Sequence, residues 1–207
     1  MRASVIMNGC ADAILMASGF SRRFGARDKL LSQFGGRALA SYTLELACGM
    51  PEFSNVIFVV ANDEVARLAD DLPVTVLRNG NPARGQCESI RLGVASASAQ
   101  HYCFFPCDQP LLDEGAVRAL ISRAAPGLIV EPVFDGEPCS PSVFSANFRG
   151  ELLAIPNGES GAYVKERNPG RVVRVRVEDW RLLADVDTSE ELEALKAGTF
   201  YRKKKGT

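Results

Sequence analysis

Short apolar runs alternate with helical patterns along most of this chain. Apolar or β-branched residues are nearly continuous in five segments, residues 13–17, 55–61, 74–77, 102–106 and 128–133. Apolar residues at helical spacing occur between most of these runs, at residues 39–48, 64–71, 87–97 and 114–124. Strands that are apolar throughout and alternate with helices are typical of a mostly parallel sheet covered on both faces. We therefore predict an α/β protein with a three-layer α/β/α, Rossmann-like architecture and a mostly parallel central sheet.

One later segment has a different period. In residues 172–177 valines alternate with arginines, and this period of two predicts a half-exposed strand near an edge of the sheet. The sequence shows no internal repeat, low-complexity segment or linker. With 207 residues, of which 46% are hydrophobic and 24% charged, the chain is expected to fold as a single domain, residues 1–207.

Charge and composition argue against several classes of function. The formal net charge of −1 provides no overall positive field to hold a polyanion, so nucleic acid is not an expected partner. Basic residues 202–205 belong to a segment, residues 199–207, that we interpret as a solvated basic tail. The six cysteines lack C-x-x-C spacing and the one histidine is His101, which argues against a structural zinc site.

The pattern of apolar segments also predicts a cellular location. The sequence contains no apolar stretch of membrane-spanning length and no secretory signal pattern. We therefore expect no membrane association, a cytoplasmic location and cysteines that stay reduced.

The turn after the first predicted strand has the composition of an anion site. Ligands bind beyond the carboxyl ends of the strands in such a sheet, and the turn here consists of Ala17, Ser18 and Gly19. It matches neither the G-x-G-x-x-G loop nor the P-loop, but small residues let backbone N–H groups approach an anion closely. The polar residues that follow are Ser21, Arg22, Arg23 and Lys29. This set suits a triphosphate, and a glycine turn with solvated basic side chains is the alternative.

Two acidic segments supply candidate metal ligands. Asp108 directly follows the predicted strand at residues 102–106, and Asp185 and Asp187 precede a helical pattern at residues 189–196. A capping box explains the threonine at the start of that helix, but it does not explain the two acids before it. Mg²⁺ prefers one or two carboxylates together with substrate phosphates and water. Asp108 with Asp187 or Asp185 is therefore a sufficient metal set.

A third segment, residues 79–86, is rich in turn formers and leads into the predicted helix at residues 87–97. Its polar side chains could read the edge of a nucleotide base. An ordinary surface loop is the competing interpretation.

Taken in order, these segments resemble the MobA-like nucleotidyltransferase family, and in particular its molybdenum cofactor cytidylyltransferases. The family's opening pattern L-A-A-G-x-S-x-R-x-G is similar to residues 15–25, its lysine and leucine to residues 29–31, and its turn G-D-Q-P to residues 107–110. Its late pattern D-I-D-T-P-E-D is similar to residues 185–191, its nucleotide-side segment to residues 85–93, and its acceptor-side pattern to residues 136–144. The resemblance spans nearly the whole chain.

The resemblance implies a nucleotidyltransferase fold and a magnesium-dependent reaction. Residues 11–110 would bind CTP and residues 111–198 would bind molybdopterin, whose phosphate would attack the α-phosphate of CTP and release pyrophosphate. Asp108 would be the principal Mg²⁺ ligand, with Asp187 as the second carboxylate and Asp185 in reserve. Lys29 and Arg22 would stabilise the triphosphate and the departing pyrophosphate, so the expected catalytic set is Arg22, Lys29 and Asp108. A transfer of this kind depends on positioning and charge neutralisation more than on a protein nucleophile.

Nucleotide contacts are expected from two loops. They are Ala17, Ser18, Gly19, Ser21, Gly85, Gln86 and Ser89. In the resemblance, guanylyltransferases carry L-A-G-G where cytidylyltransferases carry A-A-G, and a side chain at Ser18 should crowd a purine, so we expect CTP rather than GTP.

Three other readings stay open. The donor could be GTP, the acceptor could be a sugar or polyol phosphate, or the chain could be a non-catalytic module that delivers cofactor to a molybdenum hydroxylase. In the catalytic reading a molybdenum hydroxylase is a possible receiving partner.

Overall fold

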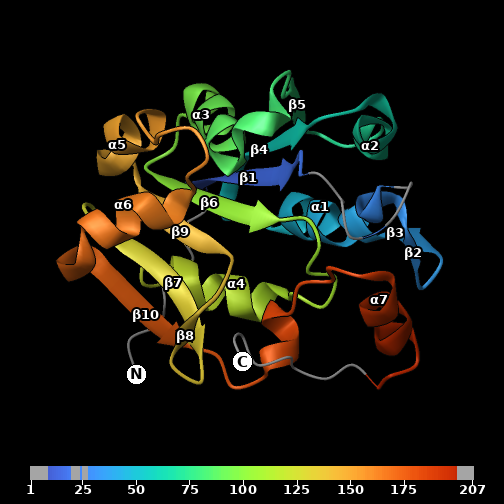
Figure 1. The fold of residues 1–207 in the computed structure, drawn as a ribbon. Helices are drawn as coiled ribbons and strands as arrows, with labels where there is room; N and C mark the ends of the chain where they lie inside the picture. The colour runs from blue at the N-terminus through green and yellow to red at the C-terminus, as the bar shows by residue number, and fades with distance from the viewer. Residues whose placement is uncertain (1–8, 20–23, 25–27, 200–207) are drawn as a thin grey trace.

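The computed structural model describes residues 9–19, 24 and 28–199. An eight-stranded sheet lies at the centre of this part of the chain (Figure 1). Its strands are β1 (Ala11–Ala17), β4 (Phe53–Val60), β5 (Thr75–Arg78), β6 (His101–Pro106), β7 (Ile129–Phe134), β8 (Glu137–Pro138), β9 (Ser142–Ser145) and β10 (Val172–Arg176). The order is β10-β7-β9-β6-β1-β4-β5, with β8 paired to β7. The five predicted apolar runs correspond to β1, β4, β5, β6 and β7.

Most strand pairs are parallel. β1 pairs in parallel with both β4 and β6, β4 with β5, and β7 with β10. β9 is antiparallel to β6 and to β7, between which it lies. The alternating valines and arginines form β10 at one edge of the sheet, so the prediction of an edge strand is confirmed. The insertion of β9 was not predicted, because two of its four residues are serines and the segment forms no continuous apolar run.

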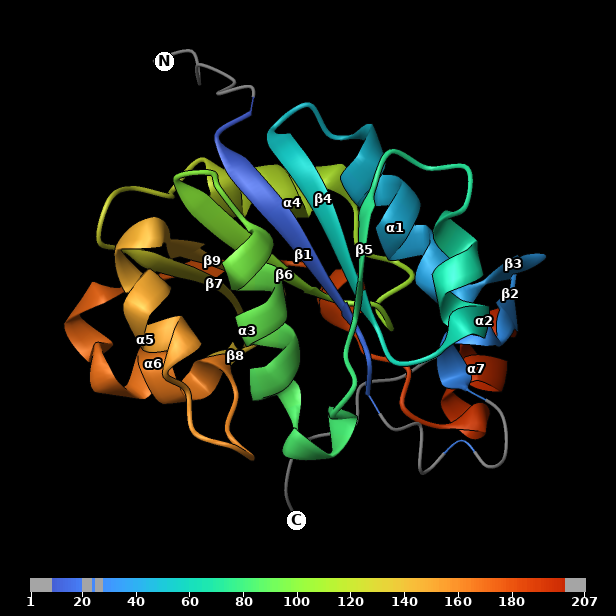
Figure 2. The same cartoon turned by 90° about the horizontal axis from the view of Figure 1, so that it is seen from above.

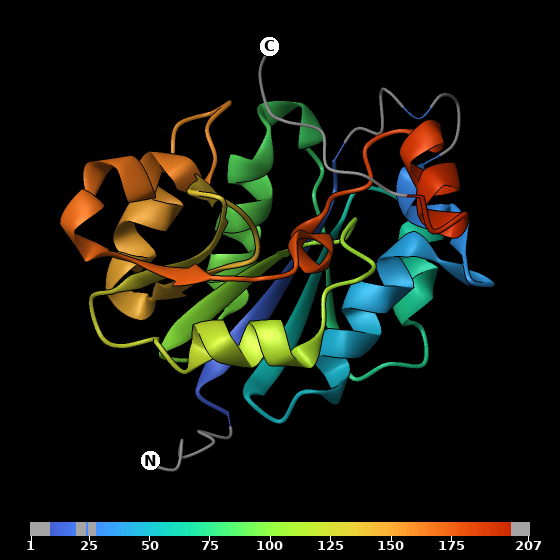
Figure 3. The same ribbon diagram turned by 90° about the horizontal axis from the view of Figure 1, so that it is seen from below.

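Helices cover both faces of the sheet, which confirms the predicted three-layer α/β/α architecture (Figures 2 and 3). The α-helices are α1 (Leu39–Gly49), α2 (Asp63–Ala66), α3 (Gln86–Ser96), α4 (Glu114–Ile121), α5 (Arg149–Leu153), α6 (Gly161–Arg167) and α7 (Ser189–Lys196). Residues of α1 and α4 share one core with one face of β1, and residues of α3, α5 and α6 form a second core with the other face. α7 packs with Leu39 in a third, smaller cluster.

Short elements complete the fold. They are the hairpin strands β2 (Gln33–Phe34) and β3 (Arg37–Ala38) and the 3₁₀ turns η1 (Lys29–Leu31), η2 (Arg67–Ala69), η3 (Pro82–Arg84), η4 (Ala146–Phe148), η5 (Pro169–Arg171) and η6 (Trp180–Leu183). Two of these turns lie at the candidate site: η1 carries Lys29 and η6 carries Trp180.

α3 packs unusually close to the central strand. A side chain at Gly93 would collide with Ile14 of β1, so glycine permits this approach. The close packing brings the first turns of α3, which contain Gln86 and Ser89, beside the loop that follows β1. The position of α3 is therefore part of how the candidate site is built.

The opposite end of the sheet holds groups with structural roles. The buried Asp12 carboxylate accepts hydrogen bonds from the backbone N–H groups of Ser98 and Ala99, at 2.6 and 2.8 Å. His101 is buried at the start of β6, with its Nδ1 atom 3.4 Å from the carbonyl oxygen of Cys10. His101 thus lies at the far end of β6 from Asp108.

All six cysteines are free thiols, and burial raises the pKa of the Cys103 and Cys107 thiols well above the usual range. Within the described ranges, no helix has both the length and the hydrophobicity needed to cross a membrane.

Candidate functional site

Three loops and the segment before α7 meet at the carboxyl-terminal edge of the sheet. Residues 17–19 follow β1, residues 79–85 follow β5, and residues 107–110 follow β6. The backbone N–H of Val186 donates to the carbonyl oxygen of Asp108 at 2.9 Å, which joins the late acidic segment to the β6 loop. Parallel strands place their carboxyl ends together, so residues far apart in the sequence converge here.

The lysine of η1 connects two of the candidate metal ligands. Lys29 Nζ lies 2.6 Å from Asp108 Oδ2 and 3.0 Å from Asp187 Oδ1. It also donates to the carbonyl oxygen of Val186 at 3.2 Å. The side chains of Lys29 and Asp108 are each only 16% exposed, whereas that of Asp187 is 49% exposed. The group is therefore a partly buried charge cluster that opens to solvent on the Asp187 side.

The local sequence positions Lys29. Asp28 caps η1 by accepting a hydrogen bond from Leu30 N at 3.1 Å, and its other oxygen accepts from Asn62 Nδ2 at 3.0 Å. Burial lowers the pKa of Lys29, but the carboxylates of Asp108 and Asp187 outweigh burial and raise it above its usual value. Lys29 is therefore a fixed cation at neutral pH.

One oxygen of Asp108 has no hydrogen-bond partner among the described residues. Oδ2 pairs with Lys29, whereas Oδ1 is buried and accepts no hydrogen bond within the described part of the chain. An unsatisfied buried carboxylate oxygen costs free energy, and such atoms are typical of functional sites. Asp108 therefore retains an unused ligand atom.

Asp185 lies next to this pair but in a different environment. Gln109 Nε2 donates to Asp185 Oδ1 at 2.9 Å and to the carbonyl oxygen of Leu183 at 3.0 Å. The pKa of Asp185 is raised to about 7, first by burial and then by the negative charges of Asp108 and Asp187, while the hydrogen bond from Gln109 and the charge of Lys29 lower it. Gln109 was not among the predicted site residues, although its position in the D-Q-P turn could have identified it.

The donor set fits a divalent cation that also binds substrate. No group of three or more His, Cys, Asp or Glu side chains with metal-site geometry occurs within residues 9–19, 24 and 28–199. Mg²⁺ needs only one or two carboxylates when phosphates and water complete its shell. The free Oδ1 atom of Asp108 and the exposed carboxylate of Asp187 meet that requirement, and a bound cation would relieve the crowding of negative charge that raises the pKa of Asp185.

The loop after β1 is tied to α3 by a buried polar network. The hydroxyls of Ser18 and Ser89 form a short hydrogen bond, and Asn79 Nδ2 lies 3.1 Å from Ser18 Oγ and 3.2 Å from Ser89 Oγ. The side chains of all three residues are buried. Ser89 therefore faces Ser18 inside the protein. Asn79 belongs to the candidate segment 79–86, although it was not among the residues expected to contact the nucleotide.

Gln86 and Gly85 lie at the start of α3. Gly85 has a φ of +88° at the N-cap position, a conformation that glycine adopts without strain. The N–H of Gly158 donates to the carbonyl of Arg84 at 2.8 Å, so residues 156–160 pack against this turn. Gln86 is exposed and lines the cavity described next.

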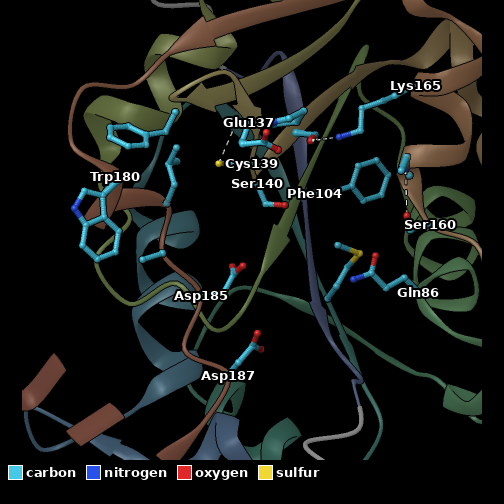
Figure 4. A pocket seen from close by; sticks show the side chains of 18 of the residues that line it. Gln86, Phe104, Glu137, Cys139, Ser140, Ser160, Lys165, Trp180, Asp185 and Asp187 are labelled. Atoms are coloured by element: carbon cyan, nitrogen blue, oxygen red, sulfur yellow. Dashed lines mark hydrogen bonds between the residues drawn. The ribbon is translucent and has the colours of Figure 1, made fainter. Parts of the chain in front are cut away.

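A cavity of about 640 Å³ opens beside the charged cluster (Figure 4). Asp185 and Asp187 line one end of it, and Gln86 and Met16 line the side formed by β1 and α3. The remaining walls come from β6, β9, α6 and η6 and carry Trp180, Lys165 and Phe104. The cavity thus connects the nucleotide half predicted from the sequence with the acceptor half.

The structure brings most of the predicted residues together. Lys29 contacts both Asp108 and Asp187. Asp185, Gln86, Ser89, Gly85 and residues 17–19 lie at the same edge of the sheet. Ser21 and Arg22 lie outside the described residues, as does the basic run 202–205.

Comparisons with known proteins agree with this arrangement. Residues 13–172 match the model of the MobA-like NTP transferase domain. A molybdenum cofactor guanylyltransferase from Ectopseudomonas mendocina is 28% identical over 186 residues, which cover 87% of this chain and 89% of that protein. A probable molybdenum cofactor guanylyltransferase from Haloferax mediterranei is 29% identical over 151 residues, covering 72% and 71% of the two chains.

Among solved structures, a nucleotidyl transferase from Methanothermobacter superposes with a TM-score of 0.80. It is 17% identical in sequence, and the match covers 92% of this chain and 97% of that one. The fold and the family match together define the class of protein: it is an enzyme, a nucleotidyltransferase. The chain belongs to the MobA-like NTP transferase family. Enzymes of this family generally use a divalent metal ion.

Proposed function

We propose that this enzyme transfers a nucleoside monophosphate from a magnesium-bound nucleoside triphosphate, CTP in the first instance, to the phosphate of molybdopterin. A phosphate oxygen of the acceptor forms a bond to the α-phosphorus of the donor. The α–β phosphoanhydride bond breaks, and pyrophosphate leaves. The products are the molybdopterin dinucleotide and pyrophosphate. The observation that carries the proposal is the contact of Lys29 with both Asp108 and Asp187 beside the loop after β1.

In this proposal the acidic residues hold the metal and Lys29 handles the triphosphate. Asp108 and Asp187 would hold Mg²⁺, which would supply positive charge to the α- and β-phosphates when bound. Lys29 would then exchange part of its contact with the carboxylates for phosphate oxygens and stabilise the charge that develops on pyrophosphate. Fixed charges of this kind lower a barrier because they require little reorganisation during the reaction.

Backbone and loop residues would position the donor. N–H groups of residues 17–19 would contact the phosphates, with Ser21 close by in the sequence. Gln86 lines the cavity and would contact the base side, whereas the hydrogen bonds of Ser89 favour a positioning role through Ser18. Gly85 would act indirectly, because its positive φ at the N-cap position sets where α3 begins.

The arginine that assists Lys29 can be Arg22 or Arg23. Adjacent residues on an irregular loop seldom point the same way, so only one of the two arginines is expected at the triphosphate, and we chose Arg22. The S-x-R spacing of the family pattern, however, aligns the family's arginine with Arg23. Comparison of Arg22→Ala with Arg23→Ala assigns the role to the variant with the larger loss of turnover.

Two observations bear on the donor nucleotide. CTP is favoured by the pattern at Ser18, where the guanylyltransferase pattern has glycine, although the Ser18 side chain is buried against Ser89 and Asn79. GTP is favoured by the names of the curated relatives, which are guanylyltransferases. We retain CTP as the proposal because it rests on a side chain of this chain, and GTP as the second candidate.

Pyrophosphate release tests the proposal directly. The purified enzyme is incubated with Mg²⁺, molybdopterin and CTP, GTP, ATP or UTP in turn, and the dinucleotide product is identified. Release with CTP supports the proposal, and release with GTP replaces the donor but keeps the reaction. Release only when a sugar or polyol phosphate replaces molybdopterin would assign a different acceptor. Binding of molybdopterin without release from any donor would favour delivery of cofactor to a partner such as a molybdenum hydroxylase.

A further inference from the structure

The cavity has two chemically different ends. Asp185 and Asp187 line the end next to the charged cluster, and we call the remainder, lined by Trp180, Lys165 and Phe134, the distal end. In Figure 4, Trp180 and Lys165 are seen on different sides of the cavity, and both lie away from Asp187. The charged cluster accounts for phosphate chemistry. It gives no role to the distal end.

Trp180 provides the distal end with an aromatic surface. The indole lines the cavity from η6 and is half-buried. The opposite rim includes Phe104, which packs edge-on against Phe144 with the ring centroids 5.5 Å apart. A large aromatic side chain that remains accessible in a cavity is suited to stacking on a flat ring.

Lys165 provides an oriented donor. Its ammonium lies 2.9 Å from Glu131 Oε2 and 3.3 Å from Ser142 Oγ. These contacts use two of the three N–H donors of a lysine. The side chain is 20% exposed and lines the cavity, so its position is fixed by protein contacts while one N–H stays available to a ligand.

The ion pair behind Lys165 explains why a lysine can be held in this wall. Glu131 is only 3% exposed, and its other oxygen lies 3.3 Å from Arg174 Nε, whose side chain is 63% exposed. Arg174 alone already gives Glu131 a cationic partner. A second cation on the cavity side is therefore more than charge balance requires.

We propose that the distal end recognises the flat heteroaromatic ring of the acceptor, with Trp180 stacking on one face of the ring and Lys165 donating a hydrogen bond to its edge. This inference rests on the proposed function, since it assumes that the acceptor phosphate lies at the Asp187 end. A fused ring with carbonyl and ring-nitrogen acceptors, such as a pterin, matches this combination of an aromatic face and an edge donor.

Trp180 is the only tryptophan of the chain, so its fluorescence reports on ligand binding without any catalytic step. Wild-type enzyme is titrated with pterin, the 2-amino-4-oxopteridine ring alone, and a free tryptophan derivative serves as the control for light absorption by the ligand. The expected result is saturable quenching. Quenching no stronger than that of the free tryptophan derivative would overturn the inference.

A double variant tests whether Lys165 binds the ring or only balances the charge of Glu131. Glu131→Gln/Lys165→Met removes both charges and leaves no unpaired buried carboxylate, and Glu131→Gln alone is its matched control. If Lys165 binds the ring, the double variant should bind pterin roughly tenfold more weakly than the single variant, because a hydrogen bond from a charged donor is lost. Equal affinity of the two variants would mean that Lys165 only balances Glu131.

Steady-state kinetics separates this inference from the proposed function. Trp180→Ala should raise the KM for molybdopterin roughly tenfold, in keeping with the loss of one stacked ring, and should leave the KM for the nucleotide unchanged. A rise in the nucleotide KM alone would assign Trp180 to the base. Saturable pterin binding without pyrophosphate release would keep the distal site and overturn the proposed function, whereas release with unchanged molybdopterin KM would do the reverse.

Discussion

The two ends of the cavity are built by different physical means. At the charged end, Lys29 and the carboxylates of Asp108 and Asp187 hold one another at 2.6 and 3.0 Å before any ligand arrives. At the distal end, Trp180 offers aromatic surface, and Lys165 forms an ion pair with the buried Glu131 in the cavity wall. The charged end is suited to groups whose charge changes during the reaction, and the distal end to a ring that only has to be held.

The two ends need different numbers of chain segments to build them. Charged groups need partners from several loops, because an unpaired charge in a partly buried site is costly. A stacking surface can come from a single side chain on a short turn such as η6. Variants at the charged end should therefore change turnover, and variants at the distal end should change acceptor binding.

The largest effect should come from Asp108→Asn. The variant weakens the metal ligand and the ion pair to Lys29 together, so turnover should fall roughly a hundredfold to a thousandfold, the range seen when one charge-stabilising group is lost. The measurement is pyrophosphate release at several magnesium concentrations.

Asp113→Asn is the matched control for this variant. Asp113 lies in the same loop but caps α4 by accepting from Ala116 N at 2.7 Å, a role that asparagine also fills. Its turnover should stay near wild type. Near-normal turnover of Asp108→Asn at low magnesium would remove Asp108 from the metal site.

The next effect concerns stability and comes from Asp185→Asn. The folded-state pKa of Asp185 is about 7, above the value of about 3.9 for an unfolded chain. The folded protein therefore keeps this proton between about pH 4 and pH 7 while the unfolded chain loses it, so wild-type stability falls as the pH rises through that window.

Asparagine has no charge to bury and can still accept the hydrogen bond from Gln109. The gain in free energy of unfolding should grow from near zero at pH 4 to on the order of 4 kcal/mol above pH 7. Urea unfolding in the presence of a chelator measures it. A gain that does not change with pH would show that Asp185 is already ionised at pH 4.

The smallest effect should be a change in donor choice in Ser18→Gly. Removal of the side chain opens the loop, so the preference for GTP over CTP should rise roughly tenfold, the size of effect that one small group has in a pocket. Pyrophosphate release with the two donors in competition gives the ratio of kcat/KM.

Ser89→Ala separates the effect of the size of the Ser18 side chain from the effect of anchoring its loop. It removes the hydrogen bond to Ser18 but keeps the Ser18 side chain, so it should lower turnover without changing the ratio. Equal shifts in both variants would assign the effect to loop anchoring, and a wild-type enzyme that already prefers GTP would contradict the crowding argument.

Long apolar strands were the easiest part of the fold to predict. The runs that became β1, β4 and β6 are buried on both faces of the sheet, so their composition alone indicated strands. β9 has four residues and runs antiparallel between β6 and β7, and nothing in its local pattern specifies that position. Its register depends on pairing with strands that are distant in the sequence.

The site residues also divide into those that the sequence predicted and those that depend on packing. Lys29, Asp108 and Asp187 were found because charged residues at strand and helix ends stand out, and the family resemblance gave them roles. Asn79 opens the candidate segment 79–86 but was not chosen as a site residue, because an asparagine in a turn has an ordinary structural explanation. Its amide contacts Ser18 and Ser89 only because α3 packs close to β1.

The alternation of strands and helices, the family and the kinds of charged group could be read from the amino-acid sequence, because they depend on local pattern and composition. The packing of the chain was needed to show that Lys29 meets Asp108 across 79 positions and Asp187 across 158, that Ser89 faces inward, and that Trp180 and Lys165 line one cavity. Those contacts arise from the way the strands and helices pack together, and the energy that holds each charge depends on how much water the packed chain excludes around it.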